Sequence, residues 1–401
     1  MKPVISRDMF GPFVLLALLA LAMPLSLQTW MALINNYAID KAGFDGADIG
    51  ILQSVREIPG FLSFAVVFFL PFIREQRLVV LCLILLGIGT ALSGFYTDLV
   101  GLAMITLIAS IGFHYSEALQ QSLALQWFSK AEAPKKLGKL VAVRSSGSLI
   151  AFAFVFLADD FLDLEIRWIF VAGGAATVLL ALVAWIFFPL FQSGTEQHKT
   201  LILRKRYWLY YALTFMAGAR RQIFTVFAGF LMVEKFGFEP GSVALIFLAN
   251  GVLTMIVAPL VGRMIAHWGE RRALILEYSG LILVFTAYAF VETAWFAVFL
   301  YMLDHLFFAM ALAIKTYFQK IADPADIAAS TSVSFTINHI VAVVIPVLFG
   351  MVWLVSPAYV FLAGAGIAAI SLLLSFLVPR HPEPGLEVSV ESLRVKPAPA
   401  E

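Results

Sequence analysis

The side chains in this sequence that could do chemistry are ionisable groups placed inside long apolar stretches. Arg220 and Arg221 stand side by side in one stretch, and Asp304 and His305 stand side by side in another. A charge near the centre of a bilayer is costly unless it faces a polar interior, so such residues are candidates for function. We therefore expect these residues to bind a solute or to carry a proton.

Two stretches carry polar side chains at helical spacing. His114, Glu117 and Gln121 follow an i, i+3, i+7 pattern, which places them on one face of a helix. A second stripe consists of Asp304, Phe308, Ala311 and Lys315. We expect both stripes to face a common cavity.

The cations in the apolar stretches outnumber the carboxylates. Arg220 and Arg221 are about 100° apart on a helix, so they cannot both point inward. We expect one to meet a solute and the other to pair with a carboxylate such as Asp304 or Glu117. Arginine makes two-pronged hydrogen bonds to carboxylates and phosphates. Five cations face three carboxylates: Arg56, Arg144, Arg220, Arg221 and Lys315 against Glu57, Glu117 and Asp304. This surplus favours a small organic or phosphorylated anion as the solute.

Proton coupling needs a buried group that can change its charge. Burial and a neighbouring arginine act on a carboxyl group in opposite directions, so Glu117, Asp304 and Glu57 are the candidates. The Arg56–Glu57 pair could equally be structural. The side chains expected to contact the solute are Arg220, Arg221, His114, Gln121, Asn35, Arg56, His305 and His339.

The elements that position these residues follow from composition. Of 401 residues, 61% are hydrophobic and 13% are charged, about half the charge of a soluble domain. A soluble enzyme is therefore excluded, and the net charge of +1 gives no indication of nucleic-acid binding. Twelve apolar runs can each cross a bilayer as a helix. They lie near 11–36, 47–72, 78–96, 99–127, 138–158, 167–190, 207–233, 242–265, 273–291, 294–319, 331–354 and 358–379.

Lysine and arginine bias predicts the orientation. With the amino terminus inside, the inner segments carry 18 of these residues and the outer loops carry 3. Both termini are therefore expected in the cytoplasm, and the protein in the cytoplasmic (inner) membrane of a bacterium.

A polar segment at 191–206 divides the chain into six plus six runs. We expect an amino-terminal bundle over 1–190, a cytoplasmic linker over 191–206 and a carboxy-terminal bundle over 207–379. The remaining segment, 380–401, has few apolar anchors and is predicted to be a disordered tail.

The run from Gly262 to Arg272, Gly-Arg-Met-Ile-Ala-His-Trp-Gly-Glu-Arg-Arg, resembles the cytoplasmic loop motif of the major facilitator superfamily. The motif covers eleven residues, and the twelve-run layout covers nearly the whole chain. The resemblance implies an all-α membrane protein with twelve transmembrane helices in two six-helix bundles. It also implies that spans one, four, seven and ten line a central cavity.

The same motif suggests a gate. Its glycines, Gly262 and Gly269, permit a tight turn, and Arg271 and Arg272 can meet carboxylates or helix ends. Arg144 and Lys315 lie toward the cytoplasmic side and are expected to be gate charges.

The interpretation is a secondary transporter, not an enzyme, that works by alternating access and is coupled to protons. There is no phosphate-binding loop for ATP, no cofactor is expected, and a monomer in lipid is sufficient. One alternative is a divalent-metal transporter with His114, Glu117, Asp304 and His305 as ligands. Others are efflux of amphipathic drugs and a non-transporting receptor.

Overall fold

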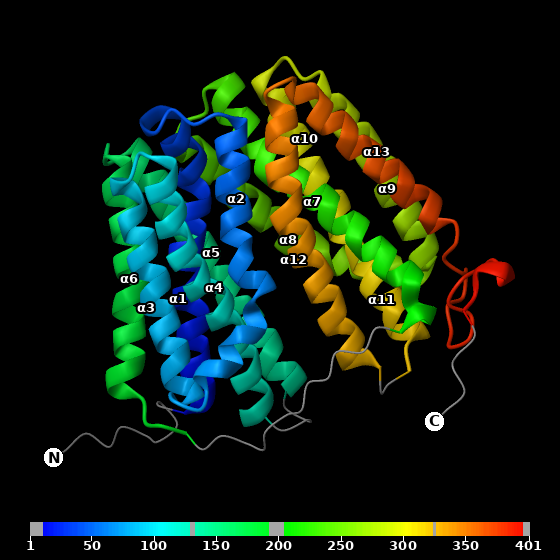
Figure 1. Ribbon diagram of the computed structural model, residues 1–401, viewed down its shortest axis with the longest axis horizontal. Coiled ribbons are helices and arrows are strands. Elements are labelled where there is room, and N and C mark those ends of the chain that lie inside the picture. The colour runs from blue at the N-terminus through cyan, green and yellow to red at the C-terminus, as the bar shows by residue number, and fades with distance from the viewer. Residues whose placement is uncertain (1–10, 129–132, 192–203, 324–325, 396–401) are drawn as a thin grey trace. The chain divides into compact units, whose positions relative to one another are not determined.

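A computed structural model describes residues 11–128, 133–191, 204–323 and 326–395 (Figure 1). These residues are almost entirely helical, and within them the only β-type pairing is an isolated bridge between Glu383 and Leu386. Backbone polar groups have no water to bond in lipid, so apolar runs of this length satisfy them by forming helices. The all-α prediction is confirmed.

The first six runs correspond to one helix each. They are α1 (Pro12–Asn36), α2 (Gly46–Phe61), α3 (Glu75–Leu92), α4 (Leu99–Trp127), α5 (Ala133–Asp160) and α6 (Ile166–Phe187). Short non-α segments extend three of them. They are a π-helix η2 (Tyr37–Lys41) after α1, a 3-10 helix η3 (Ser63–Phe69) after α2 and a 3-10 helix η4 (Ser93–Phe95) after α3.

The second six runs give seven α-helices. They are α7 (Trp208–Phe236), α8 (Pro240–Trp268), α9 (Glu270–Ala289), α10 (Ala294–Phe308), α11 (Leu312–Ile321), α12 (Ile327–Trp353) and α13 (Pro357–Ser375). A 3-10 turn, η6 (Ala309–Ala311), separates α10 from α11. The sequence predicted one unbroken helix there because it contains neither glycine nor proline at the break.

Ten helical segments of the described chain are long and apolar enough to cross a membrane, with α10 and α11 counted together. Two predicted spans fall outside this set. They are α2, which is 16 residues long, and α7, which carries Arg220 and Arg221.

The chain divides into two compact units. Unit 1 comprises Met1–Phe44, Val55–Gln197 and Phe238–Gly251, and unit 2 comprises Asp45–Ser54, His198–Gly237 and Val252–Glu401. The beginning of α8 thus belongs to unit 1, and the beginning of α2 belongs to unit 2. The division into six plus six helices with boundaries at 190 and 207 stays a prediction.

In unit 1, α3 packs against α4 and α6, and α1 packs against α5 and α6 (Figure 1). Small residues allow close approach, since a Cβ atom on Gly87 would lie 2.7 Å from the carbonyl oxygen of Gly174. Ser26 donates to Thr177 across α1 and α6 at 2.8 Å. Lipid is as apolar as the side chains of these helices, so the hydrophobic effect does not drive the helices together. Close packing and hydrogen bonds of this kind hold them instead.

The beginning of α8 is fixed to unit 1 by polar contacts. The Gly241 amide donates to Asp159 Oδ2 at 2.6 Å, and Asn36 Nδ2 donates to the Phe238 carbonyl at 2.6 Å. Phe247 packs edge to face on Phe152.

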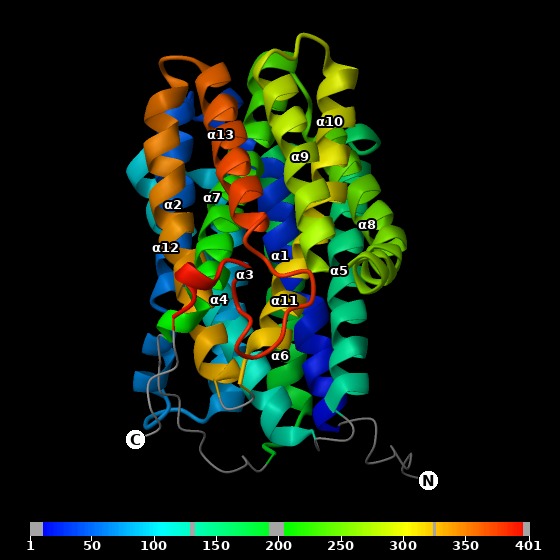
Figure 2. The same cartoon turned by 90° about the vertical axis from the view of Figure 1, so that its right-hand side faces the viewer.

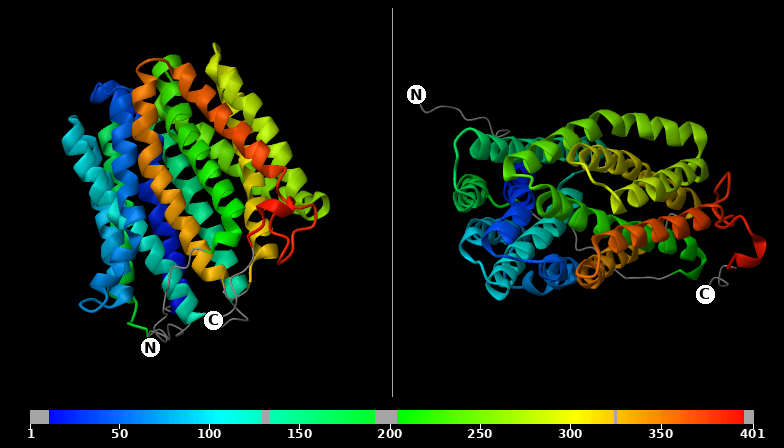
Figure 3. Two further views of the ribbon diagram at one scale, coloured as in Figure 1. Left: turned by 45° about the vertical axis from the view of Figure 1, so that its right-hand side comes forward. Right: turned by 90° about the horizontal axis from the view of Figure 1, so that it is seen from above.

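In unit 2, α9 runs beside α13, and α7 packs against α12 and α13 (Figure 3). The beginning of α2 packs on α12, where Gly50 and Gly350 lie close together. Ser54 Oγ accepts a hydrogen bond from the Val347 amide at 3.1 Å, next to the helix-interior Pro346.

The segment after α13 is folded as far as Val395 (Figure 2), whereas its composition predicted disorder. Val388 is fully buried, and the Ser389 amide donates to the Leu377 carbonyl at 2.8 Å. Most of the predicted linker (192–203) and the last residues of the predicted tail (396–401) lie outside the described residues.

Candidate functional site

The most deeply buried charges lie in unit 2 around Arg220 of α7. This arginine is 1% exposed, and its Nη2 donates to Glu277 Oε1 of α9 at 2.8 Å. Its guanidinium carbon also lies 5.0 Å from the centre of the Tyr278 ring. Arg220 is thus held by a carboxylate and an aromatic face.

A second carboxylate, Asp304 of α10, completes this cluster. Asp304 is 6% exposed and lies close enough to Arg220 and Glu277 to interact with both electrostatically. Glu277 makes the ion pair with Arg220, and Asp304 lies within electrostatic range of both without an ion pair to Arg220 among the described residues. If both are ionised the cluster carries one net negative charge, and one bound proton makes it neutral.

Sequence reasoning missed Glu277. It lies within the predicted run 273–291, so the rule that selected Asp304 also applied to it. The sequence suggested Asp304 or Glu117 as the partner of an arginine, but only the packing of α9 on α7 and α10 reveals Glu277.

Arg221 differs from its neighbour. Its side chain is exposed, with the guanidinium carbon 5.9 Å from the centre of the Phe308 ring. His305 lies nearby, half-buried, and its Nδ1 is 2.9 Å from the Tyr301 carbonyl. As expected from the helical angle, one arginine pairs with a carboxylate and the other points elsewhere.

The expected stripe from Asp304 to Lys315 does not share one environment. Asp304 is buried, Phe308 and Ala311 are half-buried, and Lys315 is exposed. The 3-10 turn η6 lies between Phe308 and Lys315, so the spacing of one continuous α-helix does not run through the whole stripe. Neither Lys315 nor Arg221 has an ion pair among the described residues.

In unit 1, Arg56 and Glu57 form a partly buried pair. Arg56 Nη2 lies 2.6 Å from Glu57 Oε1, and the guanidinium carbon lies 5.5 Å from the Trp30 ring centre. His114 Nε2 of α4 is 4.0 Å from Glu57 Oε2. Asn35 of α1 is also buried.

Arg56 also borders a small cavity among α1, α2, α3 and α4. The cavity has a volume of about 20 Å³, which is room for about one water molecule. Its other lining residues include Trp30, Thr90, Thr106 and Ser110.

The second pair of unit 1 is half-exposed. Arg144 Nη1 of α5 donates to Glu117 Oε1 of α4 at 2.8 Å, and Gln121 is exposed one turn further on. Glu117 accepts from Arg144, whereas His114 lies beside Glu57. A ring nitrogen of His114 and a carboxylate oxygen of Glu57 lie within 4.8 Å of each other, close enough for two ligands of one metal ion. His339 of α12 is half-buried against the Phe335 ring.

The gate motif is arranged differently from the expected loop. Gly262 lies inside α8, and the turn is made by Gly269 alone, whose φ of +83° favours glycine. Arg271 lies 6.0 Å from the Phe376 ring centre, and Arg272 is exposed. The carboxylate that does form a pair here is Glu270, 2.6 Å from Lys320 Nζ.

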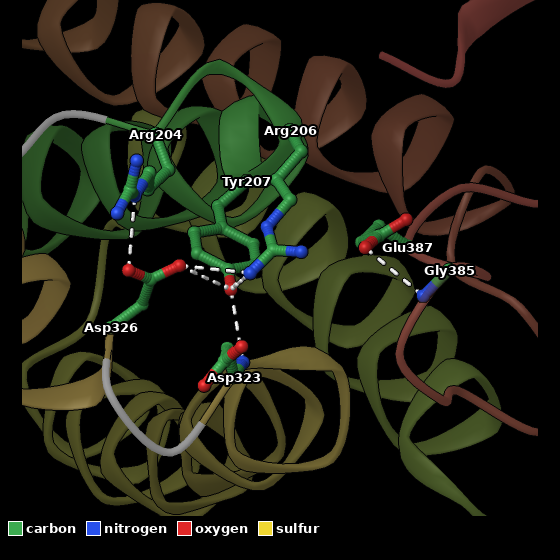
Figure 4. A network of polar contacts seen from close by, with 7 residues as sticks. All are labelled: Arg204, Arg206, Tyr207, Asp323, Asp326, Gly385 and Glu387. Atoms are coloured by element: carbon green, nitrogen blue, oxygen red, sulfur yellow. Dashed lines mark hydrogen bonds and ion pairs between the residues drawn. The ribbon is translucent and has the colours of Figure 1, made fainter. Parts of the chain in front are cut away.

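A further polar cluster joins the beginning of α7 to the beginning of α12 (Figure 4). Arg204 Nε and Arg206 Nη2 lie 3.0 and 2.8 Å from the two oxygens of Asp326, and Tyr207 Oη donates to Asp326 at 3.1 Å. Burial alone would raise the pKa of Asp326, but these hydrogen bonds outweigh it and lower the pKa below its ordinary value.

Comparison with known proteins identifies the class. The sequence profile of the Major Facilitator Superfamily matches residues 14–346 and 210–400. The chain belongs to this superfamily, and it is an integral membrane transporter. The predicted MFS-like fold with twelve transmembrane helices is therefore confirmed. No curated protein matches the chain.

Solved structures of the same fold are distant in sequence. The nucleoside transporter NupG, as a D323A mutant, is 15% identical with a TM-score of 0.77, covering 91% of this chain and 99% of that one. A bacterial homologue of the human lysosomal transporter Spinster, in an inward-facing and occupied conformation, is 14% identical with a TM-score of 0.78. It covers 98% of this chain and 100% of the other. At these identities the likeness shows the fold alone.

Proposed function

We propose that the protein is a proton-coupled secondary transporter that works by alternating access, with its proton site at Arg220, Glu277 and Asp304. The observation that supports this is the buried Arg220–Glu277 ion pair with a second buried carboxyl group, Asp304, within electrostatic range of it. A buried net charge is costly, so a single proton bound by either carboxylate stabilises the closed cluster. Movement of α7, α9 and α10 during the cycle would change that balance and release the proton.

Unit 2 is favoured over Glu117 as the proton site because Glu117 is half-exposed and matched one to one by Arg144. Solvent screens such a pair, so its protonation is weakly linked to conformation. Glu57 is intermediate, since it is buried and contacts both Arg56 and His114.

The proposed cargo is a small organic or phosphorylated anion. Three of the five cations in the apolar runs, Arg56, Arg144 and Arg220, are paired with carboxylates. The support for an anion therefore comes from Arg221 and Lys315, exposed cations on α7 and α11. In the proposed topology both termini are cytoplasmic, as the lysine and arginine bias favours, and a monomer in the cytoplasmic membrane is the working unit.

Infrared difference spectroscopy of the purified protein tests the proton site without knowledge of the cargo. We expect the band of a protonated carboxyl group at neutral pH, reduced in Glu277→Gln and in Asp304→Asn. Glu117→Gln is the matched control and should leave the band unchanged. If both unit 2 variants keep the wild-type band, the proton site is elsewhere.

The cargo is tested by thermal-shift measurements against a panel of organic and phosphorylated anions, metals and drugs. A ligand that binds only the folded state stabilises it by RT ln(1 + [L]/Kd), so the shift grows with the ligand concentration relative to Kd. Shifts by anions that disappear in Arg221→Gln, and not in Arg144→Gln, would support the anion. Shifts by divalent metals alone would favour the metal alternative.

A further inference from the structure

The segment 380–395, which we call the strap, folds back across one end of unit 2 (Figure 2). It is bonded to three helices or their flanks: the Ser389 amide donates to the Leu377 carbonyl at 2.8 Å, and Trp208 Nε1 of α7 donates to the Leu393 carbonyl at 3.2 Å. Tyr317 Oη of α11 donates to the Glu387 carbonyl at 2.5 Å. The strap thus ties α7, α11 and the end of α13 together.

The strap also contains hydrogen bonds between its own residues. Arg394 Nε donates to the Val388 carbonyl at 2.8 Å, and the Gly385 amide donates to Glu387 Oε1 at 3.1 Å (Figure 4). Val388 is fully buried and Glu387 is 5% exposed, whereas Val390 is 42% exposed. Val388 is the one apolar side chain of the strap that is fully buried. The strap is therefore attached by this side chain and a few hydrogen bonds, which is a contact small enough to open locally.

Among the helices that the strap contacts, α11 is the shortest, with ten residues. It lies at the end of the membrane span that it forms with α10, and it packs on α9 and α7. The 3-10 turn η6 separates it from α10, and a 3-10 stretch within a helical span often marks a hinge. Its far end is held by Tyr317, by the Lys320–Glu270 pair and by the Asp323 amide, which donates to Tyr207 Oη at 3.0 Å.

We propose that the strap controls the mobility of α11: docked, it holds this helix against α7 and α9, and undocked, it lets α11 move about the turn at Ala309–Ala311. An effect of the strap on transport rests on the proposed function, because α11 carries Lys315, one of the two cations proposed to bind the cargo. A docked strap would slow the movement of this side chain during transport, and release of the strap would speed it. The coupling between strap and helix does not itself depend on what is transported.

Hydrogen–deuterium exchange of the full-length protein in lipid nanodiscs tests the coupling. Val388→Asp places a charge at the fully buried position and should undock the strap. We expect the amides of 312–321 to exchange about tenfold faster, because local opening then needs no strap release. Val390→Asp makes the same chemical change at the exposed position and should leave exchange in 312–321 unchanged.

A milder variant tests the same coupling in case Val388→Asp does not fold. Tyr317→Phe removes only the hydroxyl that meets the Glu387 carbonyl, and exchange should rise in α11 and in the strap together. Tyr359→Phe, at an exposed position of α13, is its control. Unchanged exchange of α11 in both Val388→Asp and Tyr317→Phe, or an equal rise in the controls, would overturn the proposal. A loss of the carboxyl band from the proton site would bear on the proposed function and not on this result.

Discussion

The pairs Arg220–Glu277 and Arg144–Glu117 have the same chemistry and the same N···O distance of 2.8 Å, but their surroundings differ. The side chains of the first pair are 2% and 0% exposed, and those of the second are 35% and 36% exposed. The second pair is open to the surroundings of the helices, so where those surroundings are water, either partner can be solvated if the other is lost. Neither partner of the first pair can be solvated in this way, so burial rather than distance decides how much each pair matters.

The largest expected effect is on Glu277. Glu277→Ala leaves Arg220 buried without its hydrogen-bonded carboxylate, which we expect to cost about 3–5 kcal/mol of folding free energy. Unfolding in mixed micelles, monitored by circular dichroism, measures this loss. In the double variant Arg220→Met with Glu277→Leu, most of the stability should return, because both charges of the ion pair are removed together and Asp304, left without a nearby cation, can bind a proton and stay neutral. A loss below about 1 kcal/mol in Glu277→Ala would mean that water reaches the cluster.

An intermediate effect is expected at Asp326, whose pair lies outside the membrane-spanning segments. Asp326→Ala should cost about 1–2 kcal/mol, because charged hydrogen bonds from Arg204 and Arg206 are lost. Since folding lowers the pKa of Asp326, its contribution is present above the unfolded value of about 3.9. It is lost as the pH falls through the lower folded pKa.

The difference in stability between wild type and Asp326→Ala should therefore be constant from about pH 6 to 8 and shrink only in acid. Chemical denaturation at several pH values measures it. A difference that grows in acid would contradict the sign of the shift. Asp326→Asn, which keeps a hydrogen-bond acceptor without the charge, separates the two contributions.

The smallest effect is expected at the half-exposed pair. Glu117→Ala should cost less than about 1 kcal/mol, and added salt should reduce the difference further. The same unfolding assay as for Glu277→Ala gives the comparison directly. A cost equal to that of Glu277→Ala would show that exposure in this structure does not reflect contact with water.

The contrast also explains which site residues the sequence could indicate. Apolar context selected Arg220 and Asp304, and the helical angle correctly separated Arg220 from Arg221. The same context contained Glu277, but sequence separation gives no measure of which helices pack together. The stripe from Asp304 to Lys315 was predicted on one continuous helix, whereas a 3-10 turn at Ala309–Ala311, which contains neither proline nor glycine, interrupts that helix.

At the gate motif both glycines were predicted to permit the tight turn. Gly269 lies at the turn, whereas Gly262 lies inside α8. The acidic partner at that turn, Glu270, adjoins the arginines expected to act, yet it pairs with Lys320 of α11. A local motif predicts a turn because turn geometry is local. It does not predict an ion pair to a residue fifty positions away.

The sequence alone determined that this protein is embedded in a membrane and is built from helices. In lipid, long apolar runs can pair their backbone N–H and C=O groups only within a helix. Run length and spacing set the number and approximate ends of the spans. Only the tertiary structure decided which charges are buried together, which are exposed, and that the segment after α13 is folded. Those outcomes depend on contacts between helices far apart in the chain, where burial changes the free energy of a charge by more than local spacing can reveal.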